Sequence, residues 1–232
     1  MGLILTIETA TEICSVALAL NGNIISIREN EKGNSHSANV AVFIDEVLKE
    51  SGKLPSDIEA VAISKGPGSY TGLRIGVSSA KGLCYALNIP LIAIDTLKSM
   101  SVGFLQMSKI EKDSLLCPMI DARRMEVYSA FYYSDLNVFR DVKAEIVDET
   151  TYADYLNEYK IYFFGNGAVK CREVLGNYEN AIIVEDILLS AKNMVKLAEE
   201  KFNNNEFENT AYFEPFYLKD FIAAKPVVKG LY

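Results

Sequence analysis

The sequence predicts an α/β protein built from two similar halves, each with a mixed β-sheet. Three observations lead to this class. The first thirty residues contain three strand-like runs, residues 58–95 form a β-α-β unit, and a similar order of elements returns after residue 114. Consecutive hairpin-linked strands pair antiparallel and a β-α-β unit pairs parallel. A chain that contains both therefore predicts a mixed sheet in each half.

The first half opens with apolar, β-branched runs separated by turn signals. Asn21-Gly22 is a hairpin signal, so the second and third strands should be neighbours. The helix that follows them has apolar residues at i, i+3 and i+4 spacing. The predicted elements are strands 3–9, 13–20 and 23–29, a loop 31–35, a helix 37–50, a strand 58–64, a helix 71–87, a strand 91–95 and a helix 96–107.

The second half repeats this order in a shorter form. Two local matches support a duplication, because Ile7-Glu8-Thr9-Ala10 parallels Ile120-Asp121-Ala122-Arg123, and Gly66-Pro67-Gly68 parallels Gly165-Asn166-Gly167. The predicted elements are strands 115–121, 126–133 and 143–147, a helix 151–158, a strand 160–164, a short helix that ends at 175, a strand 181–185 and a helix 190–202.

The order β-β-β-α-β-α-β-α, occurring twice, is that of the ribonuclease-H-like fold. Two such lobes facing a cleft make up the sugar kinase, Hsp70 and actin (ASKHA) superfamily. We therefore expect one lobe at residues 1–107 and a second at 114–232. Whether the C-terminal segment packs back on the first lobe is left open.

Composition excludes several classes of protein. The chain has 232 residues, 50% of them hydrophobic, which is enough for one large core or two small ones. Its net charge of −8, without a basic stripe, argues against direct binding to nucleic-acid phosphates. Four widely spaced cysteines indicate free thiols of a reducing compartment. No signal peptide and no apolar run near 18 residues is visible, so we expect no membrane span and a cytoplasmic protein.

The glycine-rich turn at residues 66–72 permits several interpretations. It joins a strand to a helix, which suits a phosphate or a closely packed second chain. It is not a Walker A loop, and it departs from G-x-G-x-x-G because Gly72 comes one residue late. Asp95 lies where a dinucleotide fold has its ribose-binding acid, which leaves a dinucleotide-binding oxidoreductase open. The simplest alternative is that the glycines only let helix and strand pack closely.

Several motifs spread over nearly the whole chain carry a family resemblance. They are IETATE (7–12), CSVAL (14–18), His36, KGPGSYTGLRIG (65–76), IDAR (120–123), EVY (126–128), Glu214-Pro215 and Tyr217-Leu218. In these motifs the chain resembles the TsaB (YeaZ) family of bacterial proteins for tRNA threonylcarbamoyladenosine modification. The wider group also includes the catalytic paralogue TsaD and was once labelled glycoprotease.

The resemblance implies a non-catalytic partner of TsaD, the enzyme that moves the threonylcarbamoyl group onto the tRNA adenosine beside the anticodon. It also implies a TsaE-like ATPase as a third component, a homodimer when the chain is alone, and indirect contact with tRNA. We expect no cofactor and no catalytic residue. An ATP-dependent phosphotransferase or hydrolase of the same fold remains the alternative.

The resemblance also bears on metal binding. In the catalytic paralogue, two histidines follow the strand after the glycine helix, and Thr96 and Met100 occupy their positions here. A hydroxyl and a thioether do not replace an imidazole pair for a borderline metal. His36 is the only histidine in the sequence. We therefore expect no metal site, and a helix-start or turn role for His36.

The expected cleft lacks the usual residues for nucleotide chemistry. Active superfamily members end strand one with Asp-x-Gly, whereas this chain has Glu8-Thr9-Ala10, and the second half has Asp121-Ala122-Arg123. Glu8 and Asp121 facing one cleft would permit hydrolysis. Alternatively, Glu8 caps or bridges strand ends, with Arg123 or Lys65 as its partner. The candidate residues of this degenerate cleft are Glu8, Thr9, Gly66, Gly68, Asp121, Gly165 and Gly167.

Two stripes on the helix at 71–87 predict two packing faces. One stripe, Leu73, Val77, Ala80, Cys84 and Leu87, should pack on the sheet. The other consists of small residues that permit close helix approach, so either the helix at 37–50 or a partner should cover it. Related chains build a helical bundle from these two helices, which favours a partner. The predicted interface is Val40, Phe43, Val47, Ile75, Ser79, Gly82 and Ala86.

The aromatic segment at 212–218 is interpreted as an anchor that ties the C-terminal region to a groove. Three lysines lie just after this segment in the sequence, Lys219, Lys225 and Lys229, so a secondary contact with tRNA is left open.

Overall fold

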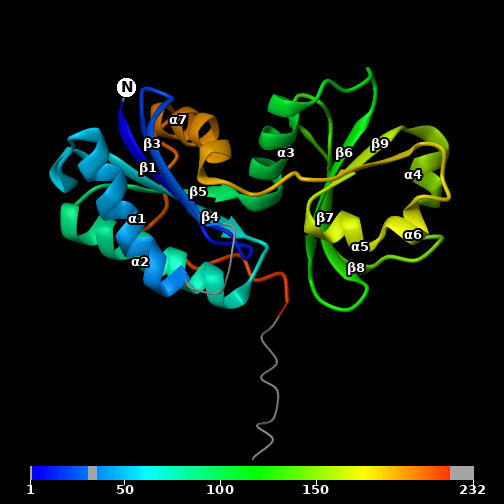
Figure 1. Cartoon of the computed structure of the whole chain (residues 1–232), viewed down its shortest axis with the longest axis horizontal. Coiled ribbons are helices and arrows are strands. Elements are labelled where there is room, and N and C mark those ends of the chain that lie inside the picture. Colours follow the sequence, from blue (N-terminus) through cyan, green and yellow to red (C-terminus); the bar gives the residue numbers. More distant parts are fainter. Residues whose placement is uncertain (1, 31–35, 220–232) are drawn as a thin grey trace, which may run out of the picture.

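The computed structural model describes residues 2–30 and 36–219. Two lobes, each built on a five-stranded mixed sheet, lie side by side (Figure 1). The chain crosses from one lobe to the other after helix α3 (Thr96–Met107) and returns after strand β10 (Ala181–Val184). The predicted loop at 31–35 lies outside the described residues. No helix among the described residues is long and apolar enough to span a membrane.

The first sheet has the order β3-β2-β1-β4-β5, with the first three strands antiparallel and β4 and β5 parallel to β1. This confirms the predicted mixed sheet. All six residues of β1 are buried, because helices cover the sheet on both faces. The strands are β1 (Leu3–Glu8), β2 (Cys14–Leu20), β3 (Asn23–Asn30), β4 (Ala60–Gly66) and β5 (Leu91–Asp95).

Helices α1 (His36–Ser51) and α2 (Tyr70–Leu87) cover one face of this sheet. The 3-10 helix η2 (Ala191–Met194) and α7 (Val195–Asn203) cover the other (Figure 1). A further 3-10 turn, η1 (Pro55–Asp57), precedes β4. The apolar side chains of α1 and α2 join those of β1 and β2 in one core, which is the physical reason for the i, i+3, i+4 pattern.

The second sheet repeats the topology as β10-β9-β6-β7-β8. Here β6, β7 and β8 are antiparallel, and β9 and β10 run parallel to β6. The duplicated fold predicted from the sequence is therefore confirmed. The elements are β6 (Leu115–Asp121), β7 (Glu126–Tyr132), β8 (Val138–Ile146), α4 (Ala153–Glu158), β9 (Ile161–Phe164), α5 (Asn166–Lys170), α6 (Arg172–Leu175) and β10 (Ala181–Val184).

Three elements of the second half differ from the prediction by more than two residues or in type. The strand expected at 143–147 is the longer β8, which begins at Val138 and has no continuously buried face. The helix expected to end at 175 is split at Cys171 into α5 and α6. The helix expected at 190–202 begins with a 3-10 turn, and Ser190 caps that turn by accepting a hydrogen bond from the Lys192 amide.

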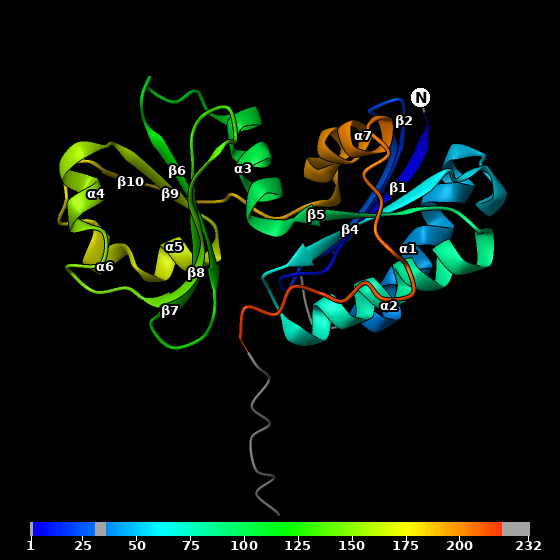
Figure 2. The ribbon, with the colours of Figure 1, turned by 180° about the vertical axis from the view of Figure 1, so that it is seen from behind.

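After α7 the chain runs back along the first lobe. It passes β5, where the Glu208 amide donates to the Leu91 carbonyl, and then follows α2 (Figure 2). We propose that residues 1–107 form one lobe and that residues 114–232 include the other. The segment from Ala191 onward belongs to the second half of the sequence but packs on the first lobe.

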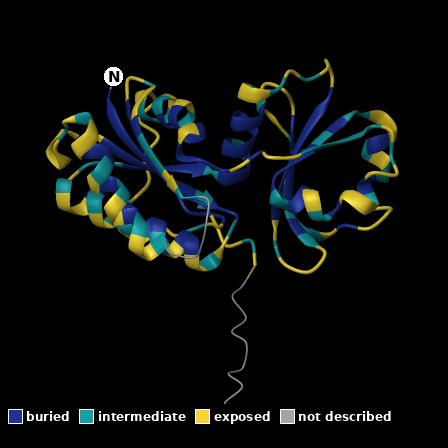
Figure 3. Ribbon diagram, viewed as in Figure 1, coloured by how far each residue is buried: buried dark blue, intermediate teal, exposed yellow. Residues whose placement is uncertain are grey.

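The central strands of each sheet form the buried centre of its lobe, and the exposed residues gather on the helices, the loops and the edge strands β3 and β8 (Figure 3). A third group of buried residues joins the lobes across α3, where Leu97, Met100 and Phe104 pack against residues of the second sheet. Phe104 stacks on Phe164 of β9 at a ring-centroid distance of 4.4 Å. The lobes therefore share an apolar contact on the α3 side.

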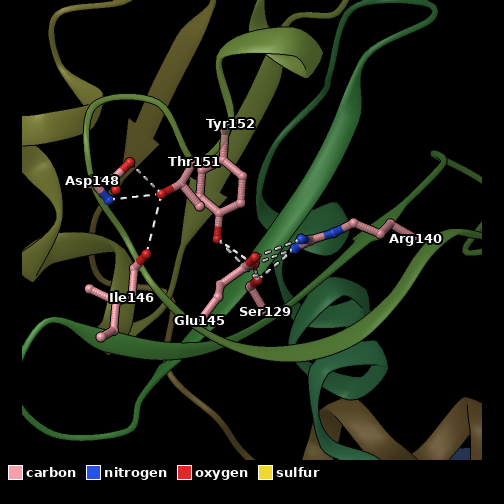
Figure 4. A network of polar contacts seen from close by, with 7 residues as sticks. All are labelled: Ser129, Arg140, Glu145, Ile146, Asp148, Thr151 and Tyr152. Carbon is pink, nitrogen blue, oxygen red and sulfur yellow. Dashed lines mark hydrogen bonds and ion pairs between the residues drawn. The ribbon is translucent and has the colours of Figure 1, made fainter.

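The second lobe also contains a buried charged network (Figure 4). The carboxylate of Glu145 forms an ion pair with Arg140 at 2.7 Å and accepts hydrogen bonds from Ser129 at 2.5 Å and Tyr152 at 2.8 Å. Although burial alone would raise it, these hydrogen bonds hold the pKa of Glu145 below its usual value. The Arg140 guanidinium also lies 4.3 Å from the ring centre of Phe131.

Removing the carboxylate of this network should destabilise the protein strongly. Glu145→Ala leaves the Arg140 guanidinium buried without its counter-charge. The side chain of Glu145 retains 18% exposure, so we expect a loss of about 2–4 kcal/mol in the free energy of unfolding, at the lower end for buried ion pairs. Urea denaturation measures this loss. Lys49→Ala, which breaks the exposed Asp45–Lys49 pair, is the control and should leave the midpoint nearly unchanged. Equal effects of the two variants would contradict the prediction.

Candidate functional site

A cleft of about 680 Å³ lies between the two lobes, at the carboxyl ends of β1, β4 and β6. In a two-lobed α/β protein this is the usual place for a ligand. Its wall combines the β1–β2 turn, the start of α1, the glycine-rich turn, the end of β6 and part of the C-terminal segment. The residues include Thr11, Glu12, His36, Gly68, Ser69, Tyr70, Asp121, Arg123, Tyr128, Asn166, Phe216, Tyr217 and Lys219.

The glycines of the turn and of α2 allow the helix to pack against the end of β1. A Cβ atom on Gly68 would clash with the Ala10 carbonyl, and one on Gly72 would clash with the Thr9 carbonyl. On Gly76 it would clash with the Thr9 hydroxyl. Each glycine therefore fills a steric need within this chain, which is the simplest of the interpretations that the sequence left open.

Amides of the same turn donate hydrogen bonds within the chain. The Gly66 amide donates to the Thr96 hydroxyl at 3.0 Å, and the Ser69 amide donates to the Ala10 carbonyl at 2.6 Å. The Gly72 amide donates to the Ser69 side chain, which caps α2, at 3.3 Å. A phosphate loop needs amides that point into the cleft, and these three do not.

Glycines also allow close packing of a helix against a strand end in the second lobe. Gly165 has φ +91°, and a Cβ atom there would lie 2.5 Å from the Met119 carbonyl oxygen. On Gly167 it would lie 2.9 Å from the Met119 side chain. The two glycines thus let α5 lie against the end of β6. Neither belongs to the cleft wall described above.

Glu8 lies behind the cleft wall and is fully buried. Its Oε1 atom accepts hydrogen bonds from the Ala10 amide at 2.7 Å and the Ser64 hydroxyl at 2.8 Å. Its Oε2 atom has no hydrogen-bond partner within residues 2–30 and 36–219. Burial raises the pKa of Glu8 from 4.5 to about 7, and the hydrogen bonds oppose this rise only in part. Glu8 therefore braces the end of β1 through the Ala10 amide and the Ser64 hydroxyl, in place of the Lys65 or Arg123 partner that the sequence suggested.

The second carboxylate, Asp121, is exposed at the cleft and pairs with Lys170. It also accepts a hydrogen bond from the Arg123 amide at 2.8 Å. Because Glu8 is buried and Asp121 is exposed, the two do not form a pair facing one cleft. Lys65, the other proposed partner of Glu8, forms an ion pair with Asp95 at 2.9 Å, so Asp95 is engaged within the chain.

The remaining candidate metal and base residues also have structural partners. His36 begins α1, and its Nε2 donates to the Thr11 carbonyl at 2.7 Å. This is the helix-start contact that the sequence predicted. Thr96 is buried and accepts from the Gly66 amide, and Met100 is buried in the apolar contact between the lobes. In residues 2–30 and 36–219, no three His, Cys, Asp or Glu side chains are arranged to hold a metal ion.

Helix α2 has the two faces that its sequence predicted, with one change at its end. Leu73, Val77, Ala80 and Cys84 are buried against the sheet, whereas Leu87 is only half-buried. On the other stripe, Gly82 and Ala86 are exposed and Ile75 and Ser79 are half-buried. A Cβ atom on Gly82 would have no neighbour within 4 Å in the part of the chain that the structure describes. No helix of the described chain therefore covers this stripe at Gly82.

The three residues predicted on α1 lie differently. Val40 and Val47 are 1% and 0% exposed, because they pack into the core against the first sheet. Their side chains lie inside the first lobe and not on the protein surface, where a partner would bind. Phe43 is half-buried at the edge of the same core. Val42, next to it, was not predicted and is 50% exposed.

The sequence alone did not predict that the C-terminal segment forms part of the cleft wall. The Phe216 amide donates to the Lys65 carbonyl at 2.7 Å, and the Tyr217 ring packs against the Tyr70 ring at a tilt of 40°, with the ring centres 4.9 Å apart. The aromatic residues at 212–218 were a signal for anchoring, and they do anchor the segment. Their position beside the glycine-rich turn depends on contacts about 150 residues apart in the sequence, which no local pattern reports.

Comparison with known proteins gives one consistent family. A family model described as TsaD, tRNA N6-adenosine threonylcarbamoyltransferase, matches residues 27–227. The chain is 32% identical to the tRNA threonylcarbamoyladenosine biosynthesis protein TsaB of Escherichia coli (strain K12), with 96% of each chain covered. It is 29% identical to the Haemophilus influenzae protein of the same name, over 96% of this chain and 95% of that one.

Solved structures show the same fold. YeaZ from Pseudomonas aeruginosa superposes with a TM-score of 0.75 at 24% identity, over 94% of this chain and all of that one. An inorganic polyphosphate/ATP-glucomannokinase from Arthrobacter sp. strain KM gives a TM-score of 0.52 at 11% identity, over 88% and 100% of the two chains, which relates the fold to sugar kinases. With these matches, the chain belongs to the TsaB (YeaZ) family, whose curated members are named for tRNA threonylcarbamoyladenosine biosynthesis.

Proposed function

We propose that this protein is a non-catalytic partner of a TsaD-like paralogue in threonylcarbamoyl transfer to the tRNA adenosine beside the anticodon. The observation that carries the proposal is the open stripe on α2. Among the described residues, no atom lies within 4 Å of the Cβ position of Gly82, and Ala86, four residues on, is also exposed. A stripe of small residues on a long helix lets a second helix approach closely. The family match supplies the identity of the partner.

The state of the cleft supports the non-catalytic part of the proposal. Its glycine-rich turn is packed against Thr9 and Ala10, and the amides of Gly66, Ser69 and Gly72 donate hydrogen bonds within the chain. The strand-end carboxylate, Glu8, is buried and hydrogen-bonded to its own backbone neighbour. General acid–base catalysis requires a group within reach of the substrate, and Glu8 has no such access.

The two rival functions have less support. An ATP-dependent phosphotransferase or hydrolase would need the turn amides and a cleft-facing carboxylate pair, and Glu8 and Asp121 do not provide that pair. A dinucleotide-binding oxidoreductase would need a parallel sheet that opens with the glycine turn. Here the turn follows β4 of a mixed sheet, and Asp95 is paired with Lys65.

Further components of the system are part of the same proposal. The small-residue stripe on α2 would also serve a second copy of this chain when the paralogue is missing. A TsaE-like ATPase is the third protein of the proposed assembly, and contact with tRNA is indirect, in keeping with a net charge of −8. Four buried free cysteines fit the reducing cytoplasm as the proposed location.

Reconstitution tests the function directly. The purified chain alone should show no ATP turnover and no transfer to tRNA. Added to a TsaD-like paralogue and a TsaE-like ATPase from the same organism, it should raise the rate of threonylcarbamoyl transfer to tRNA. Transfer that proceeds equally well without it would contradict the proposal, as would ATP turnover by the isolated chain that Glu8→Gln abolishes.

A substitution on the open stripe should weaken association and leave the protomer stable. Gly82→Leu adds a branched side chain where residues 2–30 and 36–219 place no neighbouring atom, so the melting temperature of the protomer should stay close to wild type. A partner helix that approaches Gly82 would meet steric overlap, which typically costs about 1–3 kcal/mol. We expect the dissociation constant for the paralogue, measured by calorimetry, to rise by about tenfold or more.

Gly76→Ala is the matched control on the same helix. Its Cβ atom would meet the Thr9 hydroxyl, so this smaller change should lower the melting temperature of the isolated protein. The proposal about α2 would be wrong if Gly82→Leu lowered the melting temperature as Gly76→Ala does and left the affinity for the paralogue unchanged.

The ionisation of Glu8 should make the free energy of unfolding depend on pH. Burial raises its pKa from 4.5 to about 7, so between these values the folded state keeps a proton that the unfolded state has lost. The free energy of unfolding should therefore fall as pH rises through this window, by up to about 3 kcal/mol. Glu8→Gln, which does not ionise, should flatten this slope and stabilise the protein above pH 7.

Urea denaturation at half-unit steps from pH 5 to pH 8 measures the slope. Glu12→Gln, an exposed carboxylate at the same turn, is the control and should keep the wild-type slope. A wild-type slope that Glu8→Gln does not change would show that burial of Glu8 has no such consequence.

A further inference from the structure

Residues 208–219 are here called the strap, and its residues from 208 to 216 bind the first lobe. The Glu208 amide donates to the Leu91 carbonyl at 2.9 Å. Further along, the Lys81 ammonium of α2 donates to the carbonyls of Ala211 at 3.2 Å and Phe213 at 2.9 Å. The Phe213 side chain packs against the first core. The strap is thus a built part of the lobe, and Figure 2 shows it running along α2.

The glycine-rich turn is shaped to let the strap pass. Gly66 has φ +113°, and a Cβ atom there would lie 2.7 Å from the Phe216 carbonyl oxygen. The Phe216 amide donates to the Lys65 carbonyl at 2.7 Å, which fixes the strap at the end of β4. The first glycine of the turn therefore makes room for the strap, whereas Gly68 and Gly72 make room for the end of β1.

Past this point the strap reaches the second lobe. Phe216, Tyr217 and Lys219 belong to the wall of the cleft. The Lys219 ammonium forms an ion pair with the carboxylate of Glu126, the first residue of β7. The side chain of Lys219 is 47% exposed and that of Glu126 is 19% exposed. The strap is thus held by backbone hydrogen bonds and apolar packing on one lobe, and by a partly exposed ion pair on the other.

From this asymmetry we propose that the strap is a latch that sets the angle between the lobes, and that it releases at the Lys219–Glu126 end. Apolar packing at α3 joins the lobes on one side, and the strap joins them at the cleft. An ion pair with this exposure is weak and is screened by salt, so it separates far more readily than the contacts of the strap with the first lobe. Its loss leaves the lobes joined by the apolar contact around α3 and, at the cleft, by a long hydrogen bond from the Asn166 side-chain amide to Glu12 at 3.4 Å, and the cleft then varies in width.

Distance measurement between the lobes tests the latch. Nitroxide labels at Lys49→Cys on α1 and Glu173→Cys on α6 report the separation by double electron–electron resonance. The four native cysteines are buried, so the added thiols are the ones that react. The starting protein should give one narrow distance distribution. Lys219→Glu places two carboxylates together and should broaden or shift this distribution.

The exchanged pair is the decisive variant. Lys219→Glu combined with Glu126→Lys restores an ion pair of opposite polarity and should restore the narrow distribution. Arg124→Glu, the same charge reversal on an exposed residue of the β6–β7 turn, is the control and should leave it unchanged. Gly66→Ala, which places a methyl group against the Phe216 carbonyl, should broaden the distribution without altering the ion pair.

An unchanged distribution in Lys219→Glu would overturn the proposal, and so would a change that the exchanged pair does not reverse. Thermal unfolding of each variant accompanies the measurement. A Lys219→Glu variant that stays folded with a broadened distribution supports the latch.

Discussion

The architecture of the first lobe depends on the close approach of α2 to the end of β1. This approach requires that no side chain stand between the helix and the backbone of Thr9 and Ala10, which only glycine permits at 68 and 72. The contact fixes the first turn of α2, and with it the rear of the cleft. It also fixes which stripe of α2 faces the sheet and which stripe stays open. The site and the proposed partner surface are therefore two results of one steric constraint.

Much of the fold follows from local patterns. Short runs of apolar residues with a clear periodicity predict three features: the three antiparallel strands, the parallel β4 and β5, and the buried stripe of α2. The same order in the second half predicts the second sheet. The start of β8 was missed because this edge strand carries charged residues and lacks a continuously buried face.

The site was harder to predict, because its residues are defined by distant partners. The sequence identified Glu8 as a residue at the end of β1, but whether it faces the cleft depends on Ser64, which lies on another strand. The helical pattern predicts that Val40 and Val47 lie on an apolar face, but it does not show whether that face packs on this chain or on a partner. The strap is held beside Gly66 by a backbone hydrogen bond between residues 65 and 216. A backbone contact between such distant residues has no local sequence pattern from which it could be predicted.

Helix α2 has a mechanical consequence. It has 18 residues and is therefore about 27 Å long, with one end at the cleft and its open stripe toward the other. If a helix of this length tilts as a rigid rod, a tilt of about 5° at the glycine-rich end displaces the far end by about 2 Å. That displacement is comparable to the shifts by which packed helices move at subunit interfaces. An event in the cleft can thus be transmitted to the small-residue stripe by the backbone of one helix, without a chain of intervening side chains.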